Sequence, residues 1–309
     1  MKAVLMDDYG GPEVLRLGEA PDPVAGPGEI LVEIHAASVN AADWKVREGF
    51  RRDDVKLTFP HILGRDFSGV VRALGAGVTD FAPGDGVFAV IDRGREGGYA
   101  EAFAIQADLA AAKPPRLSHA EAAALALTGL TALVALEDAA ALQAGETVLI
   151  HGGAGGVGSF AVQLAKHLGA RVLTTASARN HDYLRSLGAA AVIDYTRQDF
   201  AEAASACDVV FDTIGGAVHA RSFAVLKPGG RLVHIAAAPT GFTAPRDDVT
   251  VIRPHVGRDR AHLERILELV EQGAVRPPEI RHMPLEKAAQ AHELSQAGHV
   301  RGKIVFEVR

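Results

Sequence analysis

The sequence predicts an α/β protein in which a β-rich region precedes a doubly wound parallel sheet, and three observations support this. Up to about residue 115, short β-like runs are broken by glycine and proline. From residue 147 onward, apolar strands alternate with helices, which is typical of a parallel sheet covered on both faces. A glycine cluster joins the first of these strands to the helix after it. The length of 309 residues suggests about two domains.

The β-rich region is expected to contain four strands, at 30–34, 67–73, 86–90 and 100–105, with turns at 26–28 and 83–86. Apolar and polar residues alternate strictly over 31–35. Because successive side chains of a strand point to opposite faces, this strand should bury one face and expose the other.

The next helix should begin near Ser118, because Ser118 and Glu121 have the spacing of a capping box. Its apolar run, 122–136, is shorter than the ~20 residues of a membrane span, so we expect a packed helix of a soluble protein. The alternation that follows predicts strands at 147–151, 171–175, 191–193, 209–212 and 231–235, helices at 159–168, 181–187 and 218–226, and a turn at 227–230.

The C-terminal region predicts helices at 259–272 and 285–297 and a last strand at 302–308. A late strand after an α/β block most simply returns to the sheet of the first domain. We therefore expect the two ends of the chain to share one sheet.

Charge and cysteine content exclude several classes of protein. The net charge of −6 gives no general attraction to nucleic acid or to anionic membranes, and the scattered aromatic residues form no base-stacking series. The single cysteine, Cys207, cannot form an intramolecular disulfide or a zinc-thiolate cluster and is expected to be a small buried residue. With no secretory signal at its start, the chain is expected to be cytoplasmic.

The glycine cluster carries the strongest chemical signal. Gly153, Gly155 and Gly158 occupy the glycine positions of a G-x-G-x-x-G pattern that Gly156 and Val157 complete. The pattern alone is weak, but here it follows an apolar strand and opens a helix, as dinucleotide binding requires. The first glycine is expected to allow the tight turn, the second the approach of a pyrophosphate, and the third close packing of helix and strand.

The end of the second strand indicates which dinucleotide is bound. NAD sites normally place Asp or Glu there to bond the ribose hydroxyls. This chain has no carboxylate in that stretch before Asp182, whereas Ser177 and Arg179 could bind a 2′-phosphate. We therefore expect NADPH rather than NADH, with a solvent-facing Arg179 as the alternative interpretation.

Several ordered motifs resemble those of a known family. They are GPEVL at 11–15, SVNAADWK at 38–45, GRDFSG at 64–69, LTGLTA at 127–132, the glycine loop, and GKIV at 302–305. With them the chain resembles the medium-chain dehydrogenase/reductase superfamily, in its zinc-independent quinone oxidoreductase branch (the zeta-crystallin-like proteins and enone reductases). The resemblance implies a GroES-like catalytic domain at 1–120 and 258–309, a Rossmann NADP-binding domain at 121–257, a nicotinamide in the cleft between them, and a homodimer.

The resemblance also carries cofactor contacts over to this chain. It implies that Thr128 begins a helix facing the cofactor and that Tyr195 stacks on or bonds near the adenosine phosphate. The remaining contacts that it implies follow later strands, at Ile214, Ile235, Ala236 and Val256. The small residues that follow Ile214 and Ile235 also suit ordinary turns.

Zinc-dependent relatives supply the comparison for a metal site. By resemblance, Asn40 stands where those enzymes have their first cysteine ligand, and Arg65 and Asp66 replace their His–Glu pair. We therefore expect no catalytic zinc. Asp66 is expected to brace the active-site loop through bonds to neighbouring backbone N–H groups.

Without zinc, another group must stabilise the negative charge that forms on the substrate oxygen. The resemblance indicates Asn40, Asp43 and Lys45 as the candidate catalytic residues. Lys45 departs from the common quinone reductase motif, which tends to have tyrosine there, and resembles the enone reductases. It either donates to the enolate or quinol oxygen or is an ordinary solvated lysine.

The expected function is an NADPH-dependent, zinc-independent oxidoreductase that transfers hydride to quinones or α,β-unsaturated carbonyls. Solvent or a bound water would return the proton. Three alternatives stay open: a zinc alcohol dehydrogenase, an NADPH-binding module without turnover, and a reductase of enoyl thioesters.

Overall fold

The computed structural model describes residues 1–50, 52–53, 56–92 and 94–309, and these form two compact units. Unit 1 comprises Met1–Leu127, Arg258–Leu267 and Pro277–Arg309. Unit 2 comprises Thr128–Gly257 and Glu268–Arg276. Unit 1 is β-rich, whereas unit 2 is built around a parallel sheet.

Unit 1 contains a seven-stranded sheet of order β15-β16-β3-β5-β6-β8, with β7 paired to β3, and a three-stranded sheet of order β2-β1-β4. Its strands are β1 (Lys2–Met6), β2 (Leu15–Glu19), β3 (Glu29–Ser38), β4 (His61–Ile62), β5 (Asp66–Leu74), β6 (Gly86–Val90), β7 (Ala102–Gln106), β8 (Ala110–Ala112), β15 (Ile280–Pro284) and β16 (Lys303–Glu307). Helices α1 (Ala41–Arg47) and α8 (Ala288–Gln296) pack against each other in this unit.

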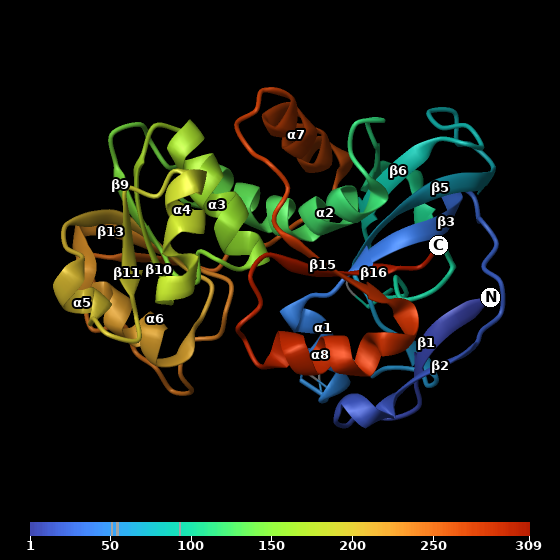
Figure 1. The fold of residues 1–309 in the computed structure, drawn as a ribbon, viewed down its shortest axis with the longest axis horizontal. Helices are drawn as coiled ribbons and strands as arrows, with labels where there is room; N and C mark the ends of the chain where they lie inside the picture. The colour runs from blue at the N-terminus through green and yellow to red at the C-terminus, as the bar shows by residue number, and fades with distance from the viewer. Residues whose placement is uncertain (51, 54–55, 93) are drawn as a thin grey trace. The chain divides into compact units, whose positions relative to one another are not determined.

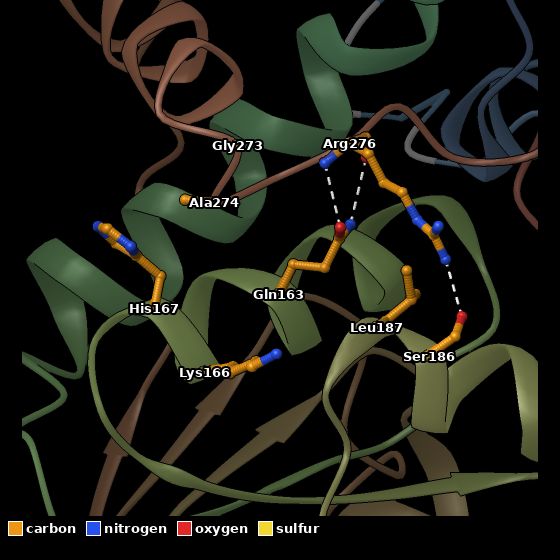
Figure 2. A pocket seen from close by; sticks show the side chains of 8 residues that line it. All are labelled: Gln163, Lys166, His167, Ser186, Leu187, Gly273, Ala274 and Arg276. Atoms are coloured by element: carbon orange, nitrogen blue, oxygen red, sulfur yellow. Dashed lines mark hydrogen bonds between the residues drawn. The ribbon is translucent and has the colours of Figure 1, made fainter.

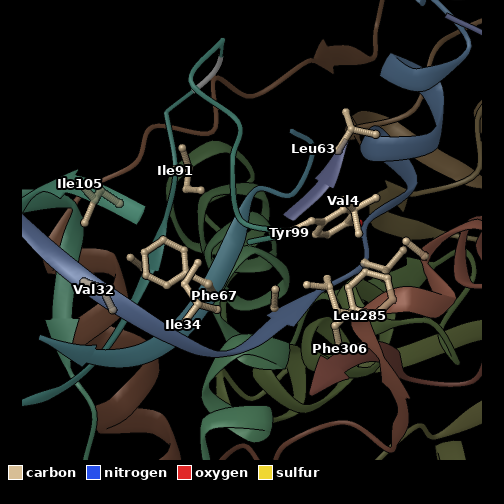
Figure 3. Close-up of a cluster of buried hydrophobic side chains, with 14 of the residues drawn as sticks. Val4, Val32, Ile34, Leu63, Phe67, Ile91, Tyr99, Ile105, Leu285 and Phe306 are labelled. Carbon is tan, nitrogen blue, oxygen red and sulfur yellow. The ribbon is translucent and has the colours of Figure 1, made fainter. Parts of the chain in front are cut away.

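The core of unit 1 follows from the alternation in β3. Ile30, Val32 and Ile34 are fully buried, whereas the residues between them are partly exposed, so the predicted one-sided strand is confirmed. Figure 3 shows Val32 and Ile34 near the aromatic ring of Phe67, and all three belong to one buried cluster. Fully burying one such side chain contributes about 1.5–3 kcal/mol.

The expected return of the last strand is also confirmed. β16 pairs antiparallel with β3, so that Val305 lies opposite Ser38. Residues more than 260 positions apart in the sequence are thus neighbours in one sheet. This pairing places Lys303 next to the start of α1.

Unit 2 contains a six-stranded sheet of order β11-β10-β9-β12-β13-β14, in which every pairing is parallel. The strands are β9 (Thr147–Ile150), β10 (Arg171–Ala176), β11 (Ala191–Asp194), β12 (Cys207–Asp212), β13 (Leu226–His234) and β14 (Thr250–Ile252), and the helices are α3 (Gly156–His167), α4 (His181–Leu187), α5 (Phe200–Ala203) and α6 (Gly216–Ser222). The chain winds outward from β9 in both directions, the Rossmann arrangement. In Figure 1, α3 and α4 lie on one side of the strands, and α5 and α6 lie on the other.

Helices α2 (His119–Leu133) and α7 (Arg260–Glu271) complete the structure, and a π-helical stretch (Val134–Ala139) extends α2. The predicted capping box is confirmed, because the Glu121 backbone N–H donates to Ser118 Oγ (3.1 Å) and the Ser118 N–H donates to Glu121 Oε2 (2.8 Å). Within the described ranges, His119–Ala139 is the one helix long and apolar enough to cross a membrane. Its apolar window is 78% buried inside the structure, and a buried core helix gives the same signal.

The expected elements differ from the structure at several places, two of which involve glycines. Residues 227–230, expected as a turn, lie within β13, where the pairing with β12 jumps from Cys207–Leu226 to Val209–Arg231. The Pro-Gly-Gly sequence is therefore a bulge inside a strand. Helix α3 begins at Gly156 rather than at 159. The sequence did not predict this earlier start, because the first turn contains glycines and glycine has a low helix propensity.

Candidate active site

The glycine loop after β9 is shaped by four glycines rather than three. The tight turn falls on Gly152, which has a φ of +69°, and not on Gly153 as the sequence pattern suggested. Gly153 is required for another reason: a Cβ there would lie 2.0 Å from Thr174 Oγ1 on the neighbouring strand β10. Gly152 thus makes the turn, and the adjacent Gly153 allows the loop to lie close to the sheet.

Gly158 has the packing role that the pattern predicts, and the space beside Gly155 fits the role expected of it. A Cβ on Gly158 would lie 2.3 Å from the Gly152 carbonyl oxygen, so only glycine allows helix and loop to pack this closely. A Cβ on Gly155 would meet only that same oxygen, at 3.6 Å, so this side of the loop is open. The opening has the form of a cradle in which a pyrophosphate can approach the backbone.

The start of α3 supplies donors to this cradle. The first helical hydrogen bond runs from the Ser159 N–H to the Gly155 carbonyl oxygen (2.8 Å), and no side chain caps the helix. The N–H groups of Gly156, Val157 and Gly158 precede that bond. They and the helix dipole can therefore bind an anion.

The predicted 2′-phosphate residues follow two neighbouring strands. Ala176 of β10 lies opposite Asp194 of β11, so Ser177 and Tyr195, the next residues, leave the sheet side by side. Arg179 is exposed, and Tyr195 is 50% exposed. No carboxylate occupies the end of β10, which keeps this corner suited to a phosphate.

Sequence reasoning missed one basic residue at this corner. Arg197 lies three residues after Asp194, its guanidinium is 3.9 Å from the Asp194 carboxylate, and its side chain is 81% exposed. Its position after β11 was the only available signal, because exposed arginines are common in loops.

The loops after β12, β13 and β14 complete this edge of the sheet. Ile214 follows β12 and is 55% exposed, Ile235 and Ala236 follow β13, and Val256 lies beyond β14. The carboxyl ends of parallel strands lie at one edge of the sheet, so Ile214, Ile235 and Ala236 lie at the same edge as the glycine loop. Val256 follows the outermost strand of that sheet.

A buried carboxylate fixes the first of these loops. Asp212 Oδ1 accepts hydrogen bonds from the backbone N–H groups of Ile214 (2.9 Å) and Gly215 (2.8 Å), and its Oδ2 lies 3.1 Å from His219 Nδ1. Asp212 is fully buried. Sequence reasoning missed it because it reads as the ordinary last residue of a strand.

Thr128 does not begin a helix, as the resemblance implied that it would. It occupies the interior of α2, which begins at His119, and it is only 3% exposed. The capping box at Ser118 starts the helix, and the Ala/Leu run carries it through Thr128 without a break.

In unit 1, the candidate Asn40 belongs to a buried polar cluster with Ser38, Asp66 and Lys303. Asn40 Nδ2 donates to Asp66 Oδ1 (2.7 Å) and to the Ser38 carbonyl oxygen (3.3 Å), and Asn40 Oδ1 accepts from Lys303 Nζ (2.8 Å). Both amide hydrogens of Asn40 are therefore engaged within the protein.

Asp66 has the bracing role that was expected of it, although it acts mainly through side chains. Its carboxylate accepts from Ser38 Oγ at 2.8 Å, from Asn40 Nδ2, and from the backbone N–H of Leu127 at 3.2 Å. Burial raises the pKa of the Asp66 carboxyl, and the nearby Lys303 ammonium acts in the opposite direction.

Asp43 is a second fully buried carboxylate. It accepts from the Asn40 N–H (2.8 Å) and from the Tyr99 hydroxyl (2.8 Å), and it pairs with Arg65 (3.3 Å). Burial raises the pKa of Asp43 to about 6. Asp43 has no exposed surface, and its bond to the Asn40 N–H holds the start of α1.

Lys45 differs from the other two candidates because its ammonium is not engaged. It lies on α1 and is partly exposed, and its side chain has no hydrogen bond or ion pair with any residue that the structure describes. Its Nζ lies 5.4 Å from the centroid of the Trp44 ring. This contact orients the cation without using its three N–H donors.

Lys303 and Tyr99 are the residues of this cluster that sequence reasoning missed as site residues. Lys303 is 5% exposed and Tyr99 is fully buried, and both reach α1 from strands or loops far away in the sequence. No local pattern distinguishes them, since the GKIV motif alone does not tell where its lysine points.

The cluster does not fit a zinc ion. Among the described residues no group of three or more His, Cys, Asp or Glu side chains could hold a metal. Lys303 donates to Asn40, and Arg65 pairs with Asp43. These two cationic side chains would repel a zinc ion held by Asn40 and Asp66.

The arrangement of unit 2, with a glycine loop at the carboxyl edge of a parallel sheet, in a chain whose last strand returns to a β-rich unit, defines the class of two-domain dehydrogenases. Residues 26–115 match the family described as alcohol dehydrogenase GroES-like domain, and residues 187–306 match the one described as zinc-binding dehydrogenase. Both matches agree with this class.

Known relatives narrow the class. The chain is 33% identical over 325 residues to the chloroplastic quinone-oxidoreductase QR1 of Triphysaria versicolor, covering 99% of this chain and 98% of that protein. It is 35% identical over 323 residues to the chloroplastic NADPH-dependent alkenal/one oxidoreductase of Arabidopsis thaliana, covering 99% and 79% respectively. The solved quinone oxidoreductase of Coxiella burnetii superposes with a TM-score of 0.93 at 38% identity, covering 100% of this chain and 99% of that one.

The chain belongs to the medium-chain dehydrogenase/reductase superfamily, in the branch of quinone oxidoreductases and enone reductases. It is therefore an oxidoreductase with a small-molecule substrate. The glycine loop and the α3 N-terminus fit the nicotinamide dinucleotide that such an enzyme uses.

Proposed function

We propose that this protein is an NADPH-dependent, zinc-independent reductase of quinones or α,β-unsaturated carbonyls. Two observations carry the proposal. The Lys45 ammonium on α1 has no hydrogen bond or ion pair with a described residue, and the Asn40–Asp66 cluster before this helix binds the ammonium of Lys303. The names of the two relatives, a quinone reductase and an alkenal/one reductase, support the substrate class.

The preference for NADPH rests on the corner after β10 and β11. Ser177 offers a hydroxyl, and Arg179 and Arg197 offer exposed guanidinium groups. A 2′-phosphate carries two negative charges that such groups bind, whereas an NADH site needs a carboxylate to accept from the ribose hydroxyls.

In the proposed reaction, bound NADPH supplies the hydride. Lys45 donates a hydrogen bond to the substrate oxygen as it becomes negative, and its charge is effective because it is held on Trp44 and only partly hydrated. Asn40 and Asp43 position the first turn of α1, which carries Lys45, and do not themselves touch the oxygen. Solvent returns the proton to the product.

The first experiment follows NADPH oxidation by purified protein with a benzoquinone, a short enone and a crotonyl-type thioester, with and without a chelator. A parallel assay follows NADP⁺ reduction with a primary alcohol. Turnover of the quinone or enone that the chelator leaves unchanged is expected. A preference for the thioester would favour the enoyl thioester reductase. Activity only with an alcohol and NADP⁺, lost with the chelator, would favour a zinc alcohol dehydrogenase. NADPH binding without turnover of any acceptor would favour a non-catalytic module.

Lys45→Met tests the proposed donor. Because an electrostatic donor to a developing oxyanion contributes about 10²–10³ in kcat, we expect a loss of that order with little change in KM. Lys287→Met, at an exposed position of unit 1, is the matched control. If Lys45→Met turns over an enone as fast as Lys287→Met, the lysine is an ordinary solvated residue.

Arg179→Gln tests the cofactor preference. Loss of a charge-assisted contact to the 2′-phosphate should raise the KM for NADPH by about tenfold and leave the KM for NADH unchanged. An equal effect on both cofactors, or equal use of both by the unmodified protein, would contradict the assignment.

We also propose that the protein is a cytoplasmic homodimer that binds neither membranes nor nucleic acid. Its negative charge and single buried cysteine support this location. Light scattering of the purified protein tests the dimer, and fractionation of cells tests the location.

A further inference from the structure

Unit 2 contains a pocket of about 320 Å³ at the end of α3 opposite the glycine loop. Figure 2 shows its lining from three elements: the last turns of α3 and α4, and the segment after α7. Three of the lining side chains are basic, namely Lys166, His167 and Arg276, and none is acidic.

These basic side chains lack acidic partners. Lys166, His167 and Arg276 form no ion pair with any residue of the described ranges. In a chain of net charge −6, most basic groups are expected to find a carboxylate nearby. Three basic side chains around a single pocket have no carboxylate partner among the described residues. This arrangement suits the binding of an anion from outside the chain.

Hydrogen bonds fix the backbone and the side chain of Arg276. Its backbone N–H donates to Gln163 Oε1 (3.0 Å), and its carbonyl oxygen accepts from Gln163 Nε2 (3.2 Å). Gln163 is only 6% exposed, so these bonds are sheltered from water. Arg276 Nη2 donates to Ser186 Oγ (2.8 Å), which leaves the other guanidinium N–H groups available.

Lys166 is fixed by packing rather than by hydrogen bonds. Its stem lies on the backbone of Gly188, where a Cβ would come within 2.2 Å of Lys166 Cδ. The lysine comes from α3 and the arginine from the segment after α7, as Figure 2 shows. A ligand in the pocket would thus meet a point charge from one element and a planar fork from another.

Helix dipoles alone do not explain this arrangement. Cations in the last turn of α3 offset the negative helix end, which accounts for Lys166 and His167. Arg276 belongs to no helix. The two helix ends carry roughly −0.5 charge each, so the charges of Lys166 and Arg276 leave the pocket positive even with His167 neutral.

We propose that this pocket binds a phosphate group of a small molecule. The guanidinium fork of Arg276 and the Lys166 ammonium give charged donors that suit a doubly charged oxyanion. The Ser186 hydroxyl donates to the Tyr183 carbonyl oxygen (2.7 Å) and accepts from Arg276, so it holds the guanidinium in place. The volume exceeds that of one phosphate, which leaves room for the organic part of a phosphate ester. This site is separate from the cofactor contacts, which lie at the other edge of the sheet.

The test is calorimetric titration of the full-length protein with inorganic phosphate at constant ionic strength. Arg276→Gln and Lys166→Gln should each weaken one class of phosphate sites by about tenfold, since each removes a charged donor. Arg185→Gln is the matched control, because Arg185 lies on α4 next to Ser186, pairs with Asp182 and does not line the pocket. It should bind phosphate like the unmodified protein.

The result that would overturn the proposal is equal phosphate binding by all four proteins, or an equal weakening by all three variants. Loss of thermal stability in Lys166→Gln without loss of phosphate binding would also overturn it, because the lysine would then serve only the helix end. Arg276→Gln keeps the backbone bonds to Gln163, and Lys166→Gln keeps the Arg276–Ser186 bond, so either variant can carry the test if the other fails to fold.

Discussion

Replacement of Lys303 by methionine tests the buried cluster that supports α1. Lys303 Nζ donates to the Val39 carbonyl oxygen (2.7 Å) and to Asn40 Oδ1 (2.8 Å), and its charge opposes the effect of burial on Asp66. Methionine keeps an unbranched side chain of similar length but removes the ammonium. Both acceptors then lose their donor, and the Asp66 carboxylate stays buried without a nearby cation.

The expected size follows from these contacts. A hydrogen bond to a charged group contributes about 1.5–3 kcal/mol, and removing one partner of a buried charged pair costs about 3–5 kcal/mol. The variant is also relieved of burying the ammonium, which favours the lower end of this range. We expect the free energy of unfolding of unit 1 to fall by about 3 kcal/mol near neutral pH.

The loss should depend on pH in a defined direction. The pKa of Asp66 is already raised above its unfolded value, so its contribution to stability is present at low pH and is lost as pH rises through the folded pKa. Without Lys303 that pKa rises further. The difference between variant and unmodified protein should therefore shrink as pH falls towards the carboxyl range.

The assay is urea unfolding followed by tryptophan fluorescence, because the only tryptophan, Trp44, lies on α1 beside this cluster. Lys287→Met, at an exposed position, should change stability by less than about 0.5 kcal/mol. Adding Asp66→Asn to Lys303→Met should recover part of the loss. A loss below about 1 kcal/mol, or one that is the same at acidic and neutral pH, would refute the reasoning.

Two further predictions concern the glycine loop and an unpaired histidine. Gly158→Ala should reduce both stability and cofactor affinity, because its Cβ would lie 2.3 Å from a backbone oxygen, whereas Gly155→Ala should reduce affinity alone. Thermal unfolding with cofactor titration separates the two, and equal stability losses would contradict this. His292 is fully buried, neither ring nitrogen has a partner among the described residues, and burial lowers its pKa to about 3. The unfolded chain then binds the proton first, so stability falls below about pH 6.5, and His292→Leu should remove about 2 kcal/mol of the loss between about pH 7 and 5. If urea unfolding shows that the variant and the unmodified protein lose the same unfolding free energy across that pH range, His292 is not the cause of the loss.

Periodicity and short motifs were sufficient for most of the architecture. The alternation in 31–35 predicted the buried face of β3, and the strand-helix alternation predicted the parallel sheet of unit 2. The capping box at Ser118 was readable because its two residues are three positions apart. Such a motif predicts the structure correctly because its hydrogen bonds form between residues that are close along the chain.

Short strands were less predictable. β1, β2 and β4 form a sheet of their own, yet no strand was expected there, and the bulge at 227–230 was read as a turn. Short or interrupted strands depend on the partner strand for their hydrogen bonds. Their own sequence therefore resembles that of a loop.

The sequence by itself determined the fold class, the glycine loop and the three candidate residues of α1. Only the tertiary structure decided their surroundings. It engaged the Asn40 amide, buried Asp43 and gave the Lys45 ammonium no hydrogen bond or ion pair with a described residue. The physical reason is distance along the chain: Lys303, which accounts for the Asn40 amide oxygen, lies 263 residues away, and no local pattern can specify a contact that forms only when β16 joins β3.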